Sequence, residues 1–329
     1  MNTFIASGPI PPLEEVAIKL TAEIPSGPAD IIEGLLPRQG QLVIAGQTNT
    51  GKSLVALEII SALTTGNPLW GELQPTLQAR KVLYVLAEHH DAVIQRLWQK
   101  TQLPMGSEVY LLGPEALGAD KWLVTGGKPN LLAIDKLKKW GEGCDLIVFD
   151  PLGAFFTGNS EDENSNLVMR LVLDSMGSIC QASGASCLVL AHQGKPMVDQ
   201  RGQEHARKSY AIRGGSAVED AATNIFYMDK AEGEAAQKAA DGKMFELRLR
   251  KYKGNAPESY RLLRDPNNLT HTLLSNRPFG DIQKIAAQGD VARLQAVFPD
   301  YNFRTCVKIA AAVRGISEET MKRHLGVTS

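Results

Sequence analysis

The eight residues at positions 46–53 constrain the fold of this chain more than any other stretch. Their pattern is G-x-x-x-x-G-K-S; an apolar run at residues 42–45 precedes it, and residues 53–63 place apolar side chains mostly at helical spacing. A strand, a glycine-rich loop and a helix in this order form a phosphate-binding loop, because glycine lets the backbone curl until its N–H groups point inward. The pattern therefore predicts an α/β fold that binds a nucleotide.

Two side chains of this loop carry the expected chemistry. In such loops the lysine, here Lys52, reaches the β and γ phosphates, and the hydroxyl at the position of Ser53 binds Mg²⁺. The following helix adds the positive end of its dipole. We therefore expect ATP and Mg²⁺ as ligands. The predicted contact residues are Gly46, Gln47, Thr48, Asn49, Thr50, Gly51, Lys52 and Ser53.

The overall composition is that of an ordinary globular protein, with 43% hydrophobic and 22% charged residues among 329. No apolar run approaches the roughly 20 residues of a membrane-spanning helix, and residues 1–12 lack the basic and apolar regions of a signal peptide. The four cysteines form no C-x-x-C pair, which predicts reduced, buried thiols. We therefore expect a cytoplasmic protein with no membrane partner.

Charge is distributed unevenly along the chain, although the net charge is only -1. Residues 243–329 contain 15 Lys and Arg against 8 Asp and Glu. A local basic excess of this kind is typical of a nucleic-acid surface. It also fits a solvated face on which charges cluster by chance, so charge alone does not decide between the two.

Apolar runs with strand character alternate with helical patterns from residue 40 onward. Strands joined by crossover helices predict a mostly parallel sheet with helices on both faces, and the last three runs are expected as partly antiparallel strands at its edge. A helix expected at residues 166–182 has a predicted buried stripe that includes Leu167. The expected strands are residues 41–45, 81–87, 109–112, 146–149, 187–191, 224–228, 244–249 and 259–263.

The chain divides into three regions. Prolines are frequent in residues 1–28, which predicts an arm or linker. Residues 29–276 form the expected α/β core. Residues 281–329 contain short helical patterns only, typical of a small all-α domain.

The C-terminal patterns resemble a helix-turn-helix over residues 304–325. Gly315 permits a tight turn, and Ser317 can cap the second helix. Lys322 and Arg323 then point outward, where a DNA-binding version of this motif meets a groove or its phosphates. A three-helix bundle used for protein contact, or a cap on the core, is the open alternative.

Three polar residues follow apolar strands. Asp150 is placed to hold the water shell of Mg²⁺, or else caps a turn. Glu88 would activate the attacking water if its strand neighbours that of Asp150, because ligands of open α/β sheets bind at the carboxyl edge; otherwise it is a solvated carboxylate. His192 reaches the same edge, either as a sensor of the γ-phosphate or as a passive residue.

The order of these motifs resembles the RecA/DnaB superfamily, and more closely the RepA-type hexameric replicative helicases of plasmids and phages. The resemblance spans residues 29–263 and rests on the phosphate loop, Glu88, Asp150, the step His192-Gln-Gly-Lys and the stretch Arg213-Gly-Gly-Ser. It implies a RecA-like P-loop NTPase core in a homo-hexameric ring. It also implies single-stranded or forked DNA as a partner, and replication proteins such as a primase or an initiator.

The resemblance further implies roles for basic residues. In such rings ATP lies between subunits, and an arginine finger of the neighbour completes the site. Relatives usually carry Lys-x-Arg where this chain has Lys251 and Lys253, and lysine lacks the bidentate fork of arginine, so Arg250 or Arg213 can serve instead. The candidate fingers are therefore Arg213, Arg250, Lys251 and Lys253, and a solvated basic hairpin is the open alternative for this cluster.

A second basic stretch, residues 193–213, matches the loop with which relatives grip single-stranded DNA. A basic loop with few aromatic residues suits contacts to the phosphate backbone better than base stacking. A plain solvent loop is the alternative. The predicted DNA contacts are Lys195, Arg201, Arg207 and Lys208.

Three functions fit these expectations. The first is an ATP-hydrolysing ring motor that acts on DNA, a replicative helicase. The second is a non-helicase ATPase of the same superfamily, such as a recombinase-like filament or a KaiC-like ring. The third is a regulator whose C-terminal helices bind DNA while ATP switches its oligomeric state.

Overall fold

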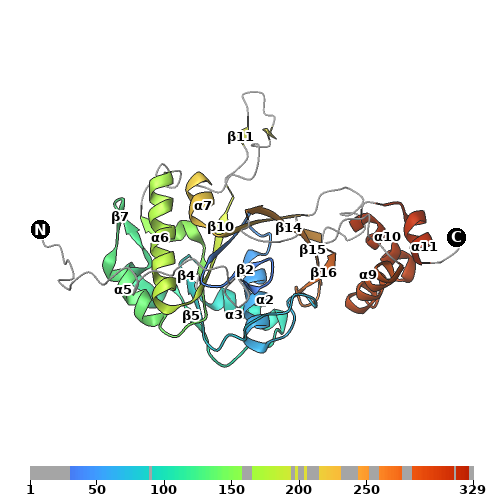
Figure 1. Cartoon of the computed structure of the whole chain (residues 1–329), viewed down its shortest axis with the longest axis horizontal. Helices are drawn as coiled ribbons and strands as arrows, with labels where there is room; N and C mark the ends of the chain where they lie inside the picture. The colour runs from blue at the N-terminus through green and yellow to red at the C-terminus, as the bar shows by residue number, and fades with distance from the viewer. Residues whose placement is uncertain are drawn as a thin grey trace, which may run out of the picture.

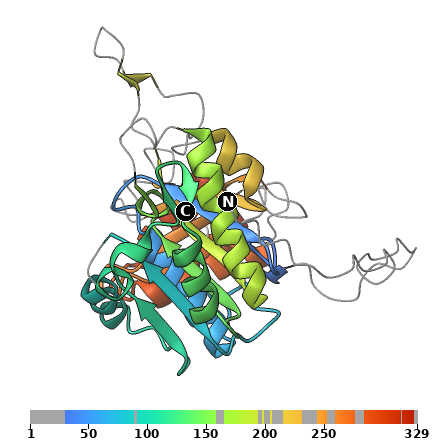
Figure 2. The ribbon, with the colours of Figure 1, turned by 90° about the vertical axis from the view of Figure 1, so that its left-hand side faces the viewer.

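The computed structural model gives the protein an α/β architecture, shown from two directions in Figures 1 and 2. It describes residues 30–88, 91–157, 165–193, 197–198, 204–205, 215–230, 244–251, 259–275, 284–314 and 316–325. The predicted arm at residues 1–28 lies outside these ranges.

A nine-stranded sheet forms the centre of the molecule. In order across the sheet, its strands are β16 (His271–Ser275), β15 (Ser259–Arg264), β14 (Met244–Lys251), β13 (Asn224–Lys230), β3 (Gln41–Gly46), β10 (Ser186–His192), β8 (Leu146–Asp150), β4 (Val82–Leu86) and β5 (Val109–Leu112). The strands from β13 to β5 are parallel, and β14 to β16 are antiparallel to their neighbours. The predicted mostly parallel sheet is therefore confirmed, although β16 lies outside the predicted runs.

Helices connect the parallel strands, because a parallel pair cannot be joined by a tight turn. The helices on one face of the sheet are α2 (Lys52–Thr65) and α3 (Asp91–Thr101), and those on the other are α5 (Leu131–Trp140), α6 (Asn166–Ser183) and α7 (Gly215–Ala221) (Figure 1). The predicted covering of both faces is thus observed.

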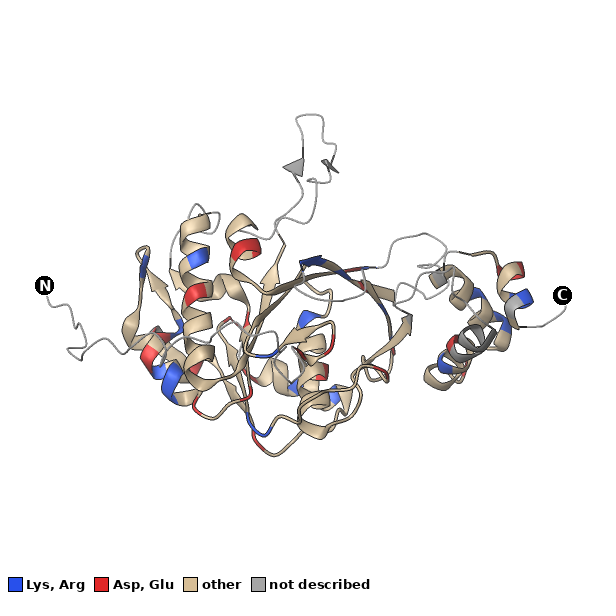
Figure 3. Ribbon diagram, in the orientation of Figure 1, with Lys and Arg blue, Asp and Glu red and all other residues tan. Residues whose placement is uncertain are grey.

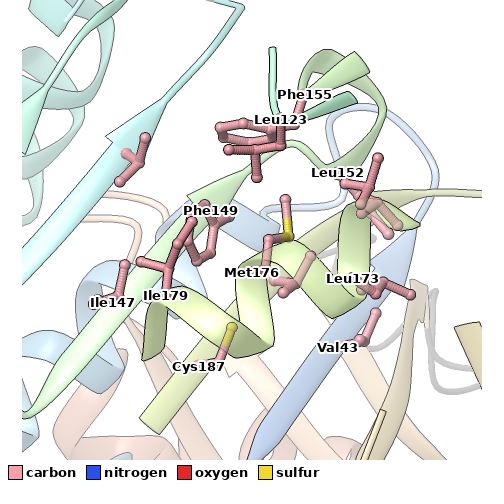
Figure 4. Packing of buried hydrophobic residues seen from close by; sticks show 14 of the residues in the cluster. Val43, Leu123, Ile147, Phe149, Leu152, Phe155, Leu173, Met176, Ile179 and Cys187 are labelled. Atoms are coloured by element: carbon pink, nitrogen blue, oxygen red, sulfur yellow. The ribbon is translucent and has the colours of Figure 1, made fainter. Parts of the chain in front are cut away.

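Strand side chains alternate between two hydrophobic clusters, one on each face of the sheet. Val43 of β3 and Phe149 of β8 belong to one cluster together with Met176 of α6 (Figure 4). Their chain neighbours Leu42 and Val148 belong to the cluster under α2 and α3. This alternation fixes the strand register, because a slip of one residue would exchange the two faces.

One expectation about α6 is wrong. Leu167 is 67% exposed, whereas Met176 is fully buried. The two residues are nine positions apart, which at about 100° per residue puts them on opposite sides of a helix. The inward positions of the first turn are taken by Val168 and Met169, which are both buried.

Short elements complete the fold. β6 pairs with β7 and β9, β1 pairs with β2, and β11 pairs with β12 in separate small sheets. Their bounds are β1 (Asp30–Ile32), β2 (Leu36–Pro37), β6 (Val124–Thr125), β7 (Lys128–Pro129), β9 (Phe156–Thr157), β11 (Met197–Val198) and β12 (Glu204–His205). The short helices are α4 (Pro114–Leu117), η1 (Gly118–Lys121) and η2 (Leu152–Ala154).

The C-terminal part contains α9 (Lys284–Val297), α10 (Phe303–Arg314) and α11 (Glu318–Leu325), which pack on one another. Ser317 Oγ accepts a hydrogen bond from the Thr320 N–H at 3.1 Å and so caps α11 as predicted, while Gly315 lies outside the described residues. The helices share a buried cluster with Leu263 and Leu274 of the sheet. Helices α9 and α11 carry both acidic and basic residues, whereas the charged residues of α10 are all basic (Figure 3). The division into domains stays a prediction.

The four cysteines are buried free thiols, as predicted. Burial raises the pKa of Cys144, Cys180 and Cys306, which keeps these thiols protonated. Within the described ranges, the helices are too short or too polar to cross a membrane.

Candidate active site

The phosphate loop lies where its pattern predicts, between the end of β3 at Gly46 and the start of α2 at Lys52. Gly46 is needed because a Cβ there would lie 2.4 Å from the carbonyl oxygen of Met228 in β13. Gly51 has a φ of 104°, a backbone conformation that residues other than glycine rarely adopt. Thr50 Oγ1 donates to the Gln47 carbonyl at 2.9 Å and closes the loop on itself. The loop is thus shaped by its own bonds and by β13.

Lys52 is buried at the first position of α2. Its Nζ donates to the carbonyl oxygens of Gly46 at 3.0 Å and Gln47 at 2.8 Å, so the ammonium group lies over the loop. Burial lowers the pKa of Lys52 from 10.5 to about 8, while Asp150 and Asp229 act in the opposite direction. A buried cation of this kind attracts phosphate strongly, because little water screens it.

Asp150 at the end of β8 joins two hydroxyl groups. Ser53 Oγ donates to Asp150 Oδ2 at 2.8 Å, and Tyr84 OH of β4 donates to the same oxygen at 2.6 Å. Burial, with Asp150 beside it, holds the pKa of Tyr84 well above its usual value, so its hydroxyl remains a donor. A serine hydroxyl next to an oriented carboxylate fits a hydrated Mg²⁺, which prefers oxygen ligands. The residues present therefore suit Mg²⁺ beside a bound phosphate.

The carboxyl edge of the sheet brings further predicted residues to the loop. β4 and β8 are neighbours, as the prediction for Glu88 requires, and Leu86 pairs with Asp150. Glu88 follows two residues later and is exposed. His192 pairs with Gly46 in the β10–β3 register and is half-buried. Glu88, Asp150 and His192 thus end neighbouring strands on the side of the sheet that carries the loop.

Arg250 and Lys251 lie elsewhere, at the far end of β14. Arg250 Nε is 2.9 Å from Glu219 Oε1 of α7, and the Lys251 ammonium donates to the Glu219 carbonyl. The bond to Glu219 raises the pKa of Arg250. In the β13–β14 register Lys251 pairs with Ile225, whereas Met228 is the residue that pairs with Gly46 of the loop. Both cations are therefore displaced from this chain's own phosphate loop.

The remaining predicted cations are only partly described. Lys322 is half-buried and Arg323 exposed on α11. The candidate fingers Arg213 and Lys253 lie outside the described residues, as do four predicted DNA contacts, Lys195, Arg201, Arg207 and Lys208.

Comparison with known proteins decides the family. A family model described as AAA domain matches residues 9–197, more than half of the chain. The chain belongs to the AAA domain family. No curated protein matches it. The AAA match includes the phosphate loop, Glu88, Asp150 and His192, and it supports an ATPase of the P-loop NTPase type, which usually binds its nucleotide with Mg²⁺.

The AAA site contains residues that sequence reasoning missed. Tyr84 is an inward-facing residue of a predicted strand, and its hydroxyl was a signal that it needs a buried partner. Asp229 follows Met228 at the loop edge of β13, near Lys52. Arg264 contacts the loop from β15. The last two gave no local signal, because their place depends on which strands become neighbours of β3.

Proposed function

We propose that this AAA protein is an ATP-driven ring motor that acts on DNA, a replicative helicase. The observation that carries the proposal is the set of strand ends beside the loop: His192 ends β10, Asp150 ends β8 and Glu88 follows the end of β4, and these are the three successive strands on one side of β3. The position of Arg250 and Lys251 away from their own loop supports an oligomer in which these cations act on a neighbouring subunit.

In this proposal each side chain has one task. Lys52 and the N–H groups of the loop bind the phosphates, and Glu88 orients and deprotonates the attacking water. His192, one strand from the loop, responds to the γ-phosphate. Ser53 and Asp150 would hold Mg²⁺, which neutralises charge on the phosphates when bound. An arginine of the neighbouring subunit would stabilise the charge that develops on hydrolysis.

Glu88→Gln tests the hydrolysis site. Loss of a general base lowers kcat by about 100-fold or more, and we expect ATP to bind as in the unchanged protein because glutamine keeps the side-chain shape. Turnover by phosphate release and ATP affinity by calorimetry are the two measurements. Glu142→Gln, at an exposed carboxylate near the amino end of β8, is the matched control. Unchanged turnover in Glu88→Gln would refute its role as the base.

Three measurements separate the motor from a non-helicase ATPase. Native mass spectrometry with ATP gives the subunit number, ATP turnover with single-stranded DNA gives stimulation, and a forked duplex reports strand displacement. A closed ring that displaces a strand supports the helicase. A filament, or a turnover rate that DNA leaves unchanged, supports the other members of the superfamily.

The capped helix α11 favours a second candidate, a DNA-binding regulator switched by ATP. Ser317 caps the helix on which Arg323 is exposed, as in a helix-turn-helix that presents its second helix to DNA. For a regulator, Arg323→Glu should weaken DNA binding at least tenfold, since a repulsive charge replaces a phosphate contact. For a motor, stimulation of the ATPase by DNA should persist. Glu319→Gln, on an exposed side chain of the same helix, is the control.

A further inference from the structure

A chain of polar contacts reaches the phosphate loop from the antiparallel end of the sheet. Arg264, the last residue of β15, donates from Nη2 to the carbonyl oxygen of Thr50 at 2.5 Å. Its Nε donates to Nε2 of His271, the first residue of β16, at 3.1 Å. The contact with Thr50 joins residues that are 214 positions apart in the sequence.

The guanidinium of Arg264 is held closely on other sides as well. It lies over the ring of Phe245, 3.8 Å from the ring centroid, in a cation–π contact. A Cβ at Gly51 would lie 2.0 Å from Nη2, so the absent side chain of this glycine is what admits the guanidinium to the loop. Burial lowers the pKa of Arg264, but arginine remains charged at physiological pH.

The contacts continue into α2 through a buried carboxylate. His271 Nδ1 is 2.9 Å from Glu58 Oε2, and the backbone N–H of His271 donates to Glu58 Oε1 at 2.5 Å. Trp70 Nε1 also donates to Glu58, at 2.9 Å. The side chains of His271 and Glu58 are 0% and 4% exposed, so these bonds form where water does not compete.

The donor groups fix the direction of the hydrogen bonds between Arg264, His271 and Glu58. Arginine has N–H donors and no acceptor, so His271 Nε2 must be the acceptor of the bond from Arg264. The ring proton of His271 is therefore on Nδ1, from which it is donated to Glu58. Both Thr50 and Glu58 belong to the loop-and-helix segment that would bind the phosphates, one just before Lys52 and one within α2.

We infer that Arg264 is a positioning residue for nucleotide binding, which holds the phosphate loop in its binding shape and is itself aimed by His271 and Glu58. A charge-assisted bond to the Thr50 carbonyl orients the peptide unit between Thr50 and Gly51, and thereby the Gly51 N–H that would face bound phosphates. The inference rests on the nucleotide-binding part of the proposed function and is independent of any action on DNA.

Calorimetric titration with ADP tests this role in two single variants and their combination. Arg264→Lys keeps the positive charge but cannot direct two fixed donors to Thr50 and His271 together. His271→Asn keeps a donor for Glu58 at the place of Nδ1 but leaves no acceptor for Arg264. Arg170→Lys is the control, since Arg170 lies on α6 and pairs with Asp174 at the surface. Thermal unfolding is recorded for each variant.

We expect Arg264→Lys to weaken ADP binding about tenfold, in line with the loss of one charge-assisted hydrogen bond. His271→Asn should weaken ADP binding by a smaller factor. The double variant should bind like Arg264→Lys, because His271 acts only through Arg264 and its loss has no further effect once Arg264 is replaced. Unchanged affinity in Arg264→Lys would overturn the inference. Additive effects of the two substitutions would also overturn it, since Arg264 would then act on ADP directly.

Hydrogen exchange of the loop amides gives a readout that needs no nucleotide. In free Arg264→Lys the amides of residues 50–53 should exchange faster than in the unchanged protein, while those of β8 keep their rates. Equal loop exchange in both proteins would contradict a positioning role. If the unchanged protein fails to bind ADP, the proposed function fails, and the exchange rates still decide the role of Arg264.

Discussion

Lys52 is a residue at which the site departs from ordinary solution chemistry. It is a buried cation in contact with two carbonyl oxygens of the loop, and burial lowers its pKa to about 8. Burial of this charge therefore lowers the free energy of unfolding of the protein. Because the pKa in the folded state lies below the unfolded value of 10.5, the cost to stability is full below pH 8 and decreases as the pH rises toward 10.5.

Proton uptake on nucleotide binding follows from this shift. Bound phosphate favours the charged form of Lys52 and raises its pKa again. Binding of ADP should therefore take up most of one proton per site at about pH 9 and almost none at about pH 7, where Lys52 is charged with and without ligand. Calorimetry in two buffers of different ionisation enthalpy measures the uptake. Equal uptake at both pH values would contradict the assignment.

At the scale of elements, the segment β3–loop–α2 depends on its neighbours for its shape. β13 closes against Gly46, β8 supplies Asp150 to Ser53, and β15 supplies Arg264 to Thr50. The close approach at Gly46 leaves no room for even one methyl group.

Gly46→Ala tests this packing. The added Cβ would lie 2.4 Å from a backbone oxygen, so β3 or β13 must move, and the protein should lose about 1–3 kcal/mol of unfolding free energy together with most of its ATP affinity. Urea unfolding and calorimetric titration measure the two effects. Gly153→Ala is the control, because a Cβ at Gly153 would meet no heavy atom within 4 Å. Similar behaviour of the two variants would refute the argument.

Over the molecule as a whole, the two finger candidates that the structure describes, Arg250 and Lys251, lie toward the opposite end of the strands from the loop. Arg250 and Lys251 are placed at the end of β14 that adjoins Ile225, away from the level of Gly46. In an oligomer these cations are therefore better placed for a neighbour than for their own subunit.

Mixing inactive subunits tests this arrangement. Lys52→Ala removes phosphate binding from a subunit's own loop, and Arg250→Ala removes a finger candidate. If Arg250 acts on the neighbour, some interfaces of a mixed oligomer pair an intact loop with an intact arginine. Part of the ATPase activity should then return, up to about a quarter of that of the unchanged protein if the subunits mix at random and the sites act independently. Each variant alone, at the same total protein concentration, is the control. If mixing restores no ATPase activity, Arg250 is not a finger that acts on the site of a neighbouring subunit in an oligomer whose sites act independently.

Much of the fold could be predicted because its signals are local. The strand at residues 109–112 is found with the predicted bounds, and the helix predicted at 166–182 is observed as Asn166–Ser183. Strand β16 escaped prediction because five residues that begin with His271 carry little alternation. Leu167 was misplaced because apolar character alone does not say which side of a helix faces the sheet.

The phosphate loop, its strand and its helix follow from local sequence alone, since glycine geometry and the spacing of Lys52 and Ser53 act over a few residues. The sequence also indicated which strands end in Glu88, Asp150 and His192. Which of these strands are neighbours depends on long-range packing, and the same packing brings Arg264 to the loop and His271 to Glu58 of α2. The physical reason is distance along the chain: such contacts join segments more than 200 residues apart, and only the packing of the whole sheet places them together.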